Sequence, residues 1–355
     1  MRTNKFLLIA LATAGMFTAC SNDDEVVMNQ GNEISFRVQG GAPSLRTTAS
    51  TINNVDAFVV YGTDDVHNST AKPNLPFLIF DGVTVARDIR QSGDIFTYAP
   101  TKYYDVGATE AAFVAFSPVS AKFDHAKTDI TNFMTGSNTI EFEYTVPRPG
   151  EHGPGLTAQE DLLIAKAVVT GTPISSSTVH LKFEHALSRI FVTAINKTAD
   201  PVIIKSLTLK NLENTGTLTF NADAGYNWSW APASSSSLRD YEYILADSGV
   251  VVTPALLETK PMFVTTMEQG MMVLPQRTAN TALLNEFDTD DFALEVVYTF
   301  ANHGTQTRHI LLQDGYRFNE KSQYTINIEF IGTSIDFTIE VDDFGAIQPV
   351  TPTYP

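Results

Sequence analysis

The stretch FALEVVYTF, residues 292–300, indicates the fold class because its apolar side chains recur at every second position. All its even-numbered residues are aromatic or aliphatic, and Ala, Glu, Val and Thr stand between them. Side chains of a β-strand alternate between the two faces of a sheet, so this period predicts a half-buried strand. Its length also suits a strand.

The same alternation recurs along the chain, whereas long helical periodicity is almost absent. Proline and glycine fall between the alternating runs, where they suit turns. Many short antiparallel strands separated by turns predict an all-β protein built of β-sandwiches. The last two runs are separated by residues 331–334, which predicts a β-hairpin with a four-residue loop. The further alternating runs are residues 34–38, 140–146, 324–330 and 335–341.

One stretch in the middle of the chain breaks the alternation. In residues 179–192 (VHLKFEHALSRIFV) the apolar positions are odd up to Leu187 and then shift to Ile190 and Val192. Such a change predicts a bulge or a single turn near residues 186–189. The preceding Ser-, Thr- and Gly-rich residues 170–177 predict a linker. We therefore expect an N-terminal domain over residues 47–174 and a C-terminal domain over residues 175–355.

The N-terminus has the features of a lipoprotein signal peptide over residues 1–19. Arg2 and Lys5 precede a short apolar run, residues 6–17, which is too short to cross a bilayer. Residues 17–20 (FTAC) resemble a bacterial lipobox, which implies cleavage before Cys20 and acylation of its thiol, for example with palmitate. The acidic residues 21–25 then suit either a surface-export signal or a solvated linker.

The net charge and the single cysteine limit which ligands the protein can bind and how it can be stabilised. The whole chain has a formal charge of −17, and loss of Arg2 and Lys5 with the signal leaves 21 basic against 40 acidic residues, or −19. Such a charge disfavours binding of nucleic acid or anionic lipid. The one cysteine, Cys20, excludes an intrachain disulfide, so stability must come from burial of apolar groups such as the 23 phenylalanines.

No motif of an enzyme or of a cofactor site is present, and we expect a protein that is not an enzyme and binds no cofactor or metal. Phosphate-binding loops, nucleophile elbows and zinc-protease motifs are absent. His180 and His185 are five residues apart, so a regular strand places them on opposite faces. His303 and His309, and the acidic loop at residues 288–291, lack the further ligands that a metal site needs.

Several segments, taken in order, resemble the fimbrillin-like family, the type V pilins of Gram-negative gut and oral anaerobes. Individually these motifs are short, but they span nearly the whole chain. Phe344 departs from the family pattern, in which a tryptophan is expected near the end of the last strand. The matching segments are residues 102–104 (KYY) with 112–118 (AFVAFSP), 159–165 (QEDLLIA), 183–188 (FEHALS), 270–276 (GMMVLPQ) and 321–326 (KSQYTI).

This resemblance implies two tandem transthyretin-like Greek-key β-sandwich domains and export as a surface lipoprotein of the cell outer membrane. It also implies a fimbrial (pilus) subunit or a fimbria-associated adhesin, with other fimbrial subunits as partners and host or bacterial surface ligands as further ones. In this family an arginine-specific protease removes the lipidated first strand. A strand of another subunit then replaces it, which is donor-strand exchange, a form of β-augmentation.

The sequence offers a candidate for each part of that scheme. Residues 33–38 (EISFRV) alternate and form the strand that would leave, within a leader that spans residues 20–46. Arg46 lies in a turn-rich segment that suits proteolysis, although a plain surface arginine is an equal alternative. Arg37 is a poorer cleavage site because it lies within the strand.

The C-terminal end offers two alternatives for the donor strand. Residues 345–355 contain Pro349, Pro352 and Pro355 and alternate little, so they make a poor donor. Either the preceding run donates, or the subunit does not donate and serves as a tip, accessory or surface lipoprotein. The apolar row of that candidate donor strand comprises Ile335, Phe337, Ile339 and Val341.

A rival hypothesis from another class is a glycan-binding surface lipoprotein that never polymerises. Trp228 and Trp230 are two residues apart, so on a strand they face the same way and are candidates for stacking on sugar rings. A pair of aromatic side chains packed on the core or at a sheet edge is the competing interpretation.

Overall fold

The chain is all-β, as the sequence predicts. The described residues form 23 strands and no helix, so none of them belongs to a helix that is long and apolar enough to span a membrane. This is the β-sandwich fold expected from the alternating runs. The computed structural model describes residues 32–39, 55–66, 78–88, 95–121, 139–149, 159, 161–221, 227–232, 238–255, 261–265, 270–277, 291–300, 304–312, 316–332 and 334–343.

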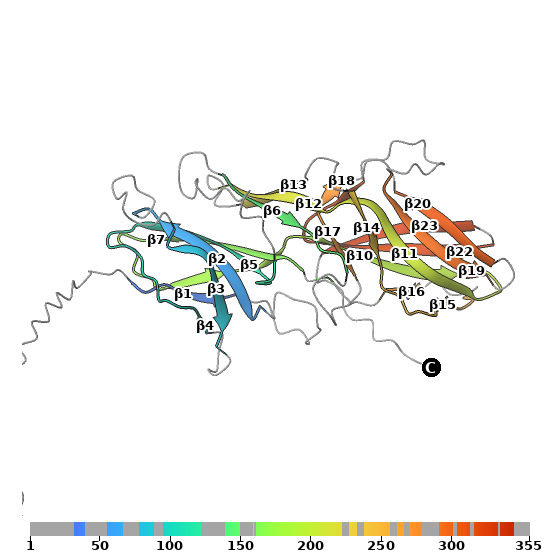
Figure 1. The fold of residues 1–355 in the computed structure, drawn as a ribbon, viewed down its shortest axis with the longest axis horizontal. Helices are drawn as coiled ribbons and strands as arrows, with labels where there is room; N and C mark the ends of the chain where they lie inside the picture. Colours follow the sequence, from blue (N-terminus) through green and yellow to red (C-terminus); the bar gives the residue numbers. More distant parts are fainter. Residues whose placement is uncertain are drawn as a thin grey trace, which may run out of the picture.

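Eight strands form one sheet in the N-terminal part of the chain (Figure 1). Its strands lie in the order β8-β1-β4-β3-β2-β5-β7-β9, and all neighbours are antiparallel except β1 and β8. In that order the strands are Thr178–Leu181, Ser35–Val38, Phe96–Thr97, Phe80–Arg87, Ala57–Asp64, Glu110–Ser117, Leu163–Thr170 and Glu184–His185.

Two five-stranded sheets form a sandwich in the C-terminal part. The first has the order β16-β10-β22-β23 with β17 also paired to β10, and the second has the order β14-β11-β19-β20 with β15 also paired to β11. The strands of the first sheet are Met262–Phe263, Ser188–Asn196, Ser322–Ile331, Ser334–Asp343 and Met271–Val273. Those of the second are Leu238–Glu242, Val202–Glu213, Ala293–Phe300, Gly304–Leu311 and Val250–Val252.

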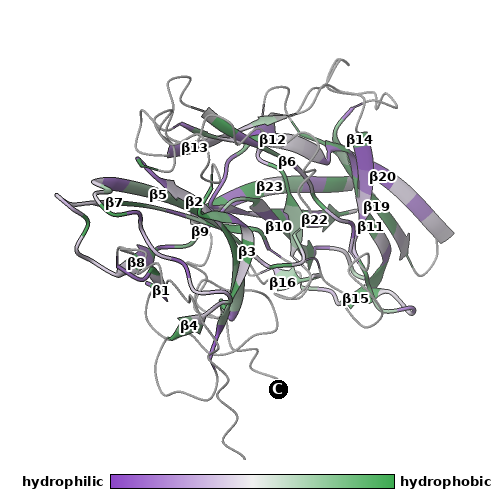
Figure 2. Cartoon of the chain, turned by 60° about the vertical axis from the view of Figure 1, so that its left-hand side comes forward, coloured by the Kyte–Doolittle hydropathy of each residue, from purple (hydrophilic) through white to green (hydrophobic). Residues whose placement is uncertain are grey.

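Aromatic side chains join the inner faces of these two sheets. The ring centroid of Tyr298 on β19 lies 5.2 Å from that of Phe330 on β22, and the Tyr243 hydroxyl donates to the Ile190 carbonyl at 3.0 Å. Burial raises the pKa of Tyr243, so this hydroxyl stays protonated. Figure 2 shows the hydrophobic segments (green) along the strands that enclose this interior, whereas the outer strand β14 is hydrophilic.

A small three-stranded sheet lies between the two larger parts (Figure 1). Its central strand β12 (Thr215–Asn221) pairs with β13 (Asn227–Pro232) and with β6 (Thr139–Thr145). Because β6 comes from the N-terminal part of the sequence, this sheet ties the two parts together. The remaining pair is β18 (Gln276–Arg277) with β21 (Arg317–Phe318).

The chain passes between the two parts at residues 186–187. Strands β8 and β9, which follow the expected domain boundary at residue 174, still pair within the eight-stranded sheet. The core is continuous across the passage, since Leu162 and Leu187 share one hydrophobic cluster with Ile190. The predicted domain boundary between residues 174 and 175 stays a prediction. The break in alternation at residues 186–189 coincides with the bend that ends β9 and precedes β10.

Local expectations from the alternating runs hold, with one correction. The run at residues 292–300 forms β19, where Leu294, Val296 and Tyr298 are buried. The hairpin of β22 and β23 has a two-residue connection, because Ile331 pairs with Ser334. The prediction of a four-residue loop is therefore wrong. The turn is tighter because Gly332 adopts a φ of 59°, a left-handed conformation that glycine tolerates.

Candidate functional site: the β1 seat and the β23 edge

The N-terminal strand β1 is an integral part of the eight-stranded core. It lies between β8, to which it is parallel, and β4, to which it is antiparallel. Ile34 and Phe36 are buried, with 0% and 2% of their surface exposed. The backbone amide of Ser35 donates to the Ser177 carbonyl at 2.7 Å, and that of Gln39 donates to the Leu181 carbonyl at 2.8 Å. We call this position between β8 and β4 the β1 seat.

Phe36 is the centre of an aromatic cluster that fills the β1 seat. Its ring meets four others edge-on, the arrangement that aromatic pairs prefer. Strands β1 and β5 are separated in the sheet by β4, β3 and β2, yet their phenylalanines touch, so the sheet curls around this ring. The centroid distances from Phe36 are 5.8 Å to Phe58, 5.3 Å to Phe80, 5.9 Å to Tyr98 and 5.7 Å to Phe113.

Polar contacts also fasten β1 at its N-terminal end. The Tyr98 hydroxyl donates to the Ile34 carbonyl at 2.5 Å, and the Asn32 side-chain amide donates to the Ile174 carbonyl at 3.0 Å. Burial raises the pKa of Tyr98 to about 12, so the phenol remains a donor throughout the physiological pH range. These bonds hold the strand to segments that are far away in the sequence.

The outward face of the β1 seat is basic. Arg37 on β1 stands directly beside His180 on β8, and both side chains are exposed, as is the following Lys182. At the other end of the pair the hydroxyl oxygens of Ser35 and Thr178 are 3.2 Å apart. Through Arg37, strand β1 therefore adds a positive charge next to the basic residues His180 and Lys182.

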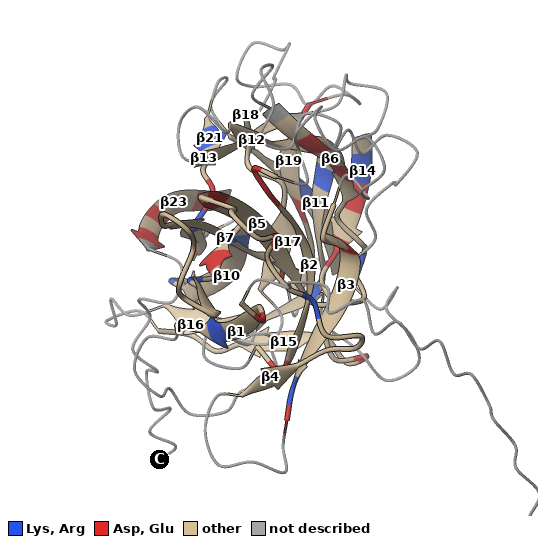
Figure 3. Cartoon of the chain, turned by 90° about the vertical axis from the view of Figure 1, so that its left-hand side faces the viewer, with Lys and Arg blue, Asp and Glu red and all other residues tan. Residues whose placement is uncertain are grey.

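The second feature is β23, the candidate donor strand, which lies at the edge of its sheet. Among the described strands it pairs with β22 alone. Ile335 and Ile339 are half-buried against the core, whereas Phe337 and Val341 are 37% and 54% exposed. Its opposite face carries the acidic Asp336, Glu340 and Asp342, which give β23 its acidic segments in Figure 3. The apolar row is thus much less buried than that of β1.

Trp228 and Trp230 face the same way on β13, as their spacing predicts. Both are half-buried and pack against the main hydrophobic cluster. The Trp230 indole N–H donates to the Ala186 carbonyl at 2.6 Å, and the ammonium of Lys321 lies 4.9 Å from the centre of the Trp228 ring. One indole is thus bound to the backbone and the other is covered by a cation. Their role in glycan stacking stays a prediction.

The sequence did not anticipate a buried contact between Asp161 and His185. A carboxylate oxygen of Asp161, which is 1% exposed, hydrogen-bonds to Nδ1 of His185 on β9. Asp161 also favours the charged form of nearby Arg189, although burial lowers the pKa of that arginine to about 10. The only signal in the sequence was that two of the quoted motifs, QEDLLIA and FEHALS, carry these residues.

Some of the other residues singled out in the sequence belong to the described part of the chain, and others lie outside it. His180 is exposed and His185 is buried, and His309 pairs with Glu295 at 3.0 Å. Among the described residues no three His, Cys, Asp or Glu side chains form a group able to hold a metal ion. The signal peptide, Cys20, Arg46, residues 288–290 of the acidic loop, His303 and residues 344–355 lie outside the described residues, so their predicted roles stay predictions.

Together these features define an all-β sandwich protein with a deeply buried N-terminal strand and a weakly buried edge strand near its C-terminus. The chain belongs to the fimbrillin-like family, whose model matches residues 45–343. That match begins after β1, so the strand in the β1 seat lies outside it. A search of curated proteins finds no match.

Solved structures with a similar fold come from Bacteroides and Porphyromonas species. A candidate cell adhesion protein from Bacteroides uniformis has a TM-score of 0.50 at 17% identity, covering 88% of this chain and 99% of its own. A fimbrial protein from Bacteroides vulgatus has a TM-score of 0.49 at 12% identity, covering 88% and 100%. The tip fimbrial protein Mfa3 from Porphyromonas gingivalis has a TM-score of 0.41 at 8% identity, covering 81% and 94%.

Proposed function

We propose that this protein is a fimbrial subunit that assembles by exchange of β1 for a strand of another subunit. Membership of the fimbrillin-like family supports the fimbrial role, and this is a family of structural and adhesion proteins rather than of enzymes. The observation that carries the exchange is the burial of Ile34 and Phe36 in a short strand close to the N-terminus. A cut between β1 and β2 would therefore separate this strand from the other described strands.

Loss of β1 would leave a surface that needs a new strand. The amides and carbonyls of β8 and β4 that β1 satisfies would lose their partners, and the aromatic cluster around Phe36 would be open to water. Burying one phenylalanine side chain contributes about 1.5–3 kcal/mol, and an open strand edge is a template for another strand. An incoming alternating segment supplies both the apolar side chains and the main-chain partners.

Strand β23 is the best donor that the described chain offers. It alternates over its whole length, contains no proline and is held by one neighbour. Phe337 and Val341, which are 37% and 54% exposed on β23, would become buried in the β1 seat of another subunit. This gain in buried apolar area would offset the loss of the contacts between β23 and β22.

Charge also favours β23 over β1 as the occupant of the β1 seat. In the unexchanged subunit Arg37 stands beside His180 on β8, and the basic Lys182 directly follows the end of that strand. A β23 strand in that position would present Asp336 or Glu340 instead, and opposite charges across two strands contribute about 0.2–1 kcal/mol. Exchange would thus replace the guanidinium of Arg37 by a carboxylate at this position.

The earlier steps of maturation in this proposal are supported by sequence features of the N-terminus. In this proposal the signal peptide is removed, Cys20 is acylated and anchors the subunit to the outer membrane, and an arginine-specific protease cuts after Arg46. That cut would free the leader, residues 20–46, together with β1. The partners would be identical or related fimbrial subunits, and the assembled fimbrium could present the protein to host or bacterial surface ligands.

A reversible disulfide across the β1 seat tests the exchange. Ser35→Cys with Thr178→Cys, in a soluble Cys20→Ser background, replaces two hydroxyl groups whose oxygens lie 3.2 Å apart. After cleavage by an arginine-specific protease, we expect the oxidised protein to stay monomeric on unheated SDS gels. Reduction should restore the ladder of polymers seen with the Cys20→Ser protein, because β1 can then leave.

The matched control is a disulfide at another strand pair. Thr145→Cys with Thr215→Cys joins β6 to β12, where the two hydroxyl oxygens are 2.9 Å apart, and should polymerise with or without reductant. Polymerisation of the oxidised β1–β8 variant at the rate of this control would show that β1 does not need to leave. Strictly monomeric Cys20→Ser protein after cleavage would count against polymerisation altogether.

A further inference from the structure

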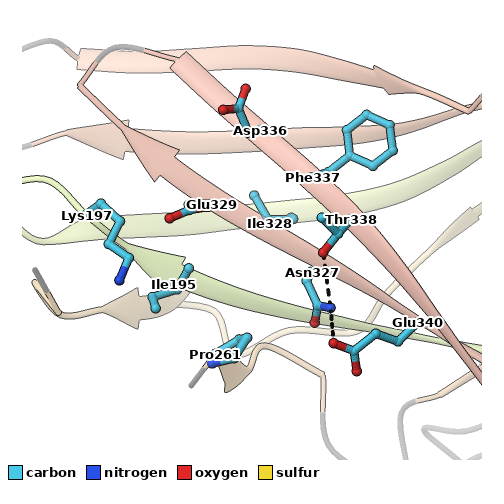
Figure 4. A pocket seen from close by; sticks show the side chains of 10 residues that line it. All are labelled: Ile195, Lys197, Pro261, Asn327, Ile328, Glu329, Asp336, Phe337, Thr338 and Glu340. Carbon is cyan, nitrogen blue, oxygen red and sulfur yellow. Dashed lines mark hydrogen bonds between the residues drawn. The ribbon is translucent and has the colours of Figure 1, made fainter. Parts of the chain in front are cut away.

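A groove on the outer face of the first five-stranded sheet lies over β22, between β10 and β23 (Figure 4). Its volume is about 340 Å³, and strands β10, β22 and β23 form its floor and one wall. Three carboxylates line it, those of Glu329, Asp336 and Glu340, together with the single ammonium group of Lys197. Glu329 stands directly across from Asp336 in the strand register. The groove is therefore acidic.

Hydrogen bonds fix one of these carboxylates without neutralising it. The Asn327 side-chain amide donates to Glu340 Oε1 at 3.1 Å and to the Thr338 hydroxyl at 3.4 Å. The Thr193 hydroxyl in turn donates to the Asn327 side-chain oxygen, which orients the amide nitrogen toward β23. An amide carries no net charge, so Glu340 is held in place at the groove while its negative charge is kept.

The edge of β23 lacks most of the devices that usually prevent strand addition, and the charged side chains that it does carry are all acidic. Its ten residues pair with β22 in one unbroken register, without a bulge, and contain neither proline nor lysine. No other described strand pairs with its outer side. Short length, bulges, prolines and charged side chains, above all lysines, are the means by which sheet edges normally avoid further pairing. The acidic residues of β23 therefore disfavour a neutral or acidic strand but not a basic one. The main-chain groups along this side are thus arranged to accept a strand.

We propose that the β23 edge binds an extended, basic segment of a partner protein as an additional strand. The side chains of such a strand alternate between the two faces of the sheet. Apolar residues would pack beside the exposed Phe337 and Val341, and lysine or arginine residues at alternate positions would lie beside Asp336 and Glu340. Charge complementarity selects this partner, since the groove carries three carboxylates against one ammonium group.

This surface is distinct from the β1 seat and does not depend on strand exchange. It requires β23 to be docked on β22, as it is in the unassembled subunit. The test therefore uses the uncleaved chain, in which β1 occupies its own seat.

The probe is a fluorescein-labelled peptide, acetyl-VKVKVKV-amide, whose affinity is measured by fluorescence anisotropy. We expect it to bind about tenfold more tightly than VEVEVEV, and to weaken when the salt concentration rises. The double variant Asp336→Asn/Glu340→Gln should bind VKVKVKV about tenfold more weakly than the unchanged chain. A VKVKVKV peptide with alternate backbone amides N-methylated keeps its charge but cannot pair as a strand, so it should not bind.

A second edge strand provides the matched control. Strand β6 carries Glu141 and Glu143 on one face, but its apolar residues Ile140, Phe142 and Tyr144 are all buried. Glu141→Gln/Glu143→Gln should therefore leave the affinity for VKVKVKV unchanged. Equal binding by the Asp336→Asn/Glu340→Gln variant, equal binding of the N-methylated peptide, or loss of binding in the β6 variant would each overturn the proposal.

Discussion

Phe36→Ala is expected to lower the free energy of unfolding by about 3–5 kcal/mol, the range for truncating a buried aromatic side chain. The ring is 2% exposed and touches aromatic rings from three other strands and a loop, so its removal leaves a cavity that no single neighbour can fill. Urea unfolding followed by far-ultraviolet circular dichroism measures the change. The same variant should also release β1 faster after cleavage, because the lost contacts are those that hold the strand.

Arg37→Ala is the control for this prediction, since Arg37 is exposed on the same strand and stands beside another basic residue. Its effect on the free energy of unfolding should be about 0.5 kcal/mol or less. If Phe36→Ala and Arg37→Ala unfold at the same urea concentration, β1 does not contribute to the stability of the core.

Phe337→Asp is expected to reduce polymer yield by at least about tenfold while changing the free energy of unfolding of the free subunit by about 1 kcal/mol or less. In the free subunit Phe337 is 37% exposed, so an aspartate there keeps contact with water. In the β1 seat of another subunit the same carboxylate would be buried among phenylalanine rings without a partner, at a cost of several kcal/mol. Quantification of ladders on unheated SDS gels after protease treatment measures the yield.

Ile331→Asp is the matched control for the donor strand. Ile331 is 41% exposed and lies at the end of β22, next to β23 but outside it. Its replacement should have a similarly small effect on unfolding and no effect on polymer yield. An equal loss of yield in both variants would indicate a general surface effect, and an unchanged yield for Phe337→Asp would exclude β23 as the donor.

Much of the local structure could be predicted because strand formation follows a local pattern of side chains. The alternating runs at residues 292–300 and 324–341 form β19 and the β22–β23 hairpin. The break in alternation near residue 187 coincides with the end of β9. The length of the hairpin loop was missed, because it depends on the conformation of Gly332 rather than on hydrophobic spacing.

The candidate site was predictable only in part. The strand at residues 33–38 and the apolar row of β23 were found from their alternation. The difference in burial between the two strands could not be predicted from alternation. Phe36 and Phe337 lie in equally apolar patterns, but they are 2% and 37% exposed. The contact between Asp161 and His185, residues 24 apart in sequence, depends on how β9 ends beside β7.

The sequence by itself determined that this protein is all-β, where most of its longer strands lie, and to which family it is similar. Only the tertiary structure decided that β1 pairs in parallel with a strand more than 140 residues further on, and that β23 stays at an edge. The physical reason is that alternation specifies which face of a strand is buried, which is a local property. Which strands become neighbours depends on long-range packing of whole sheets. That packing buries β1 between β8 and β4 and leaves β23 at the edge of its sheet.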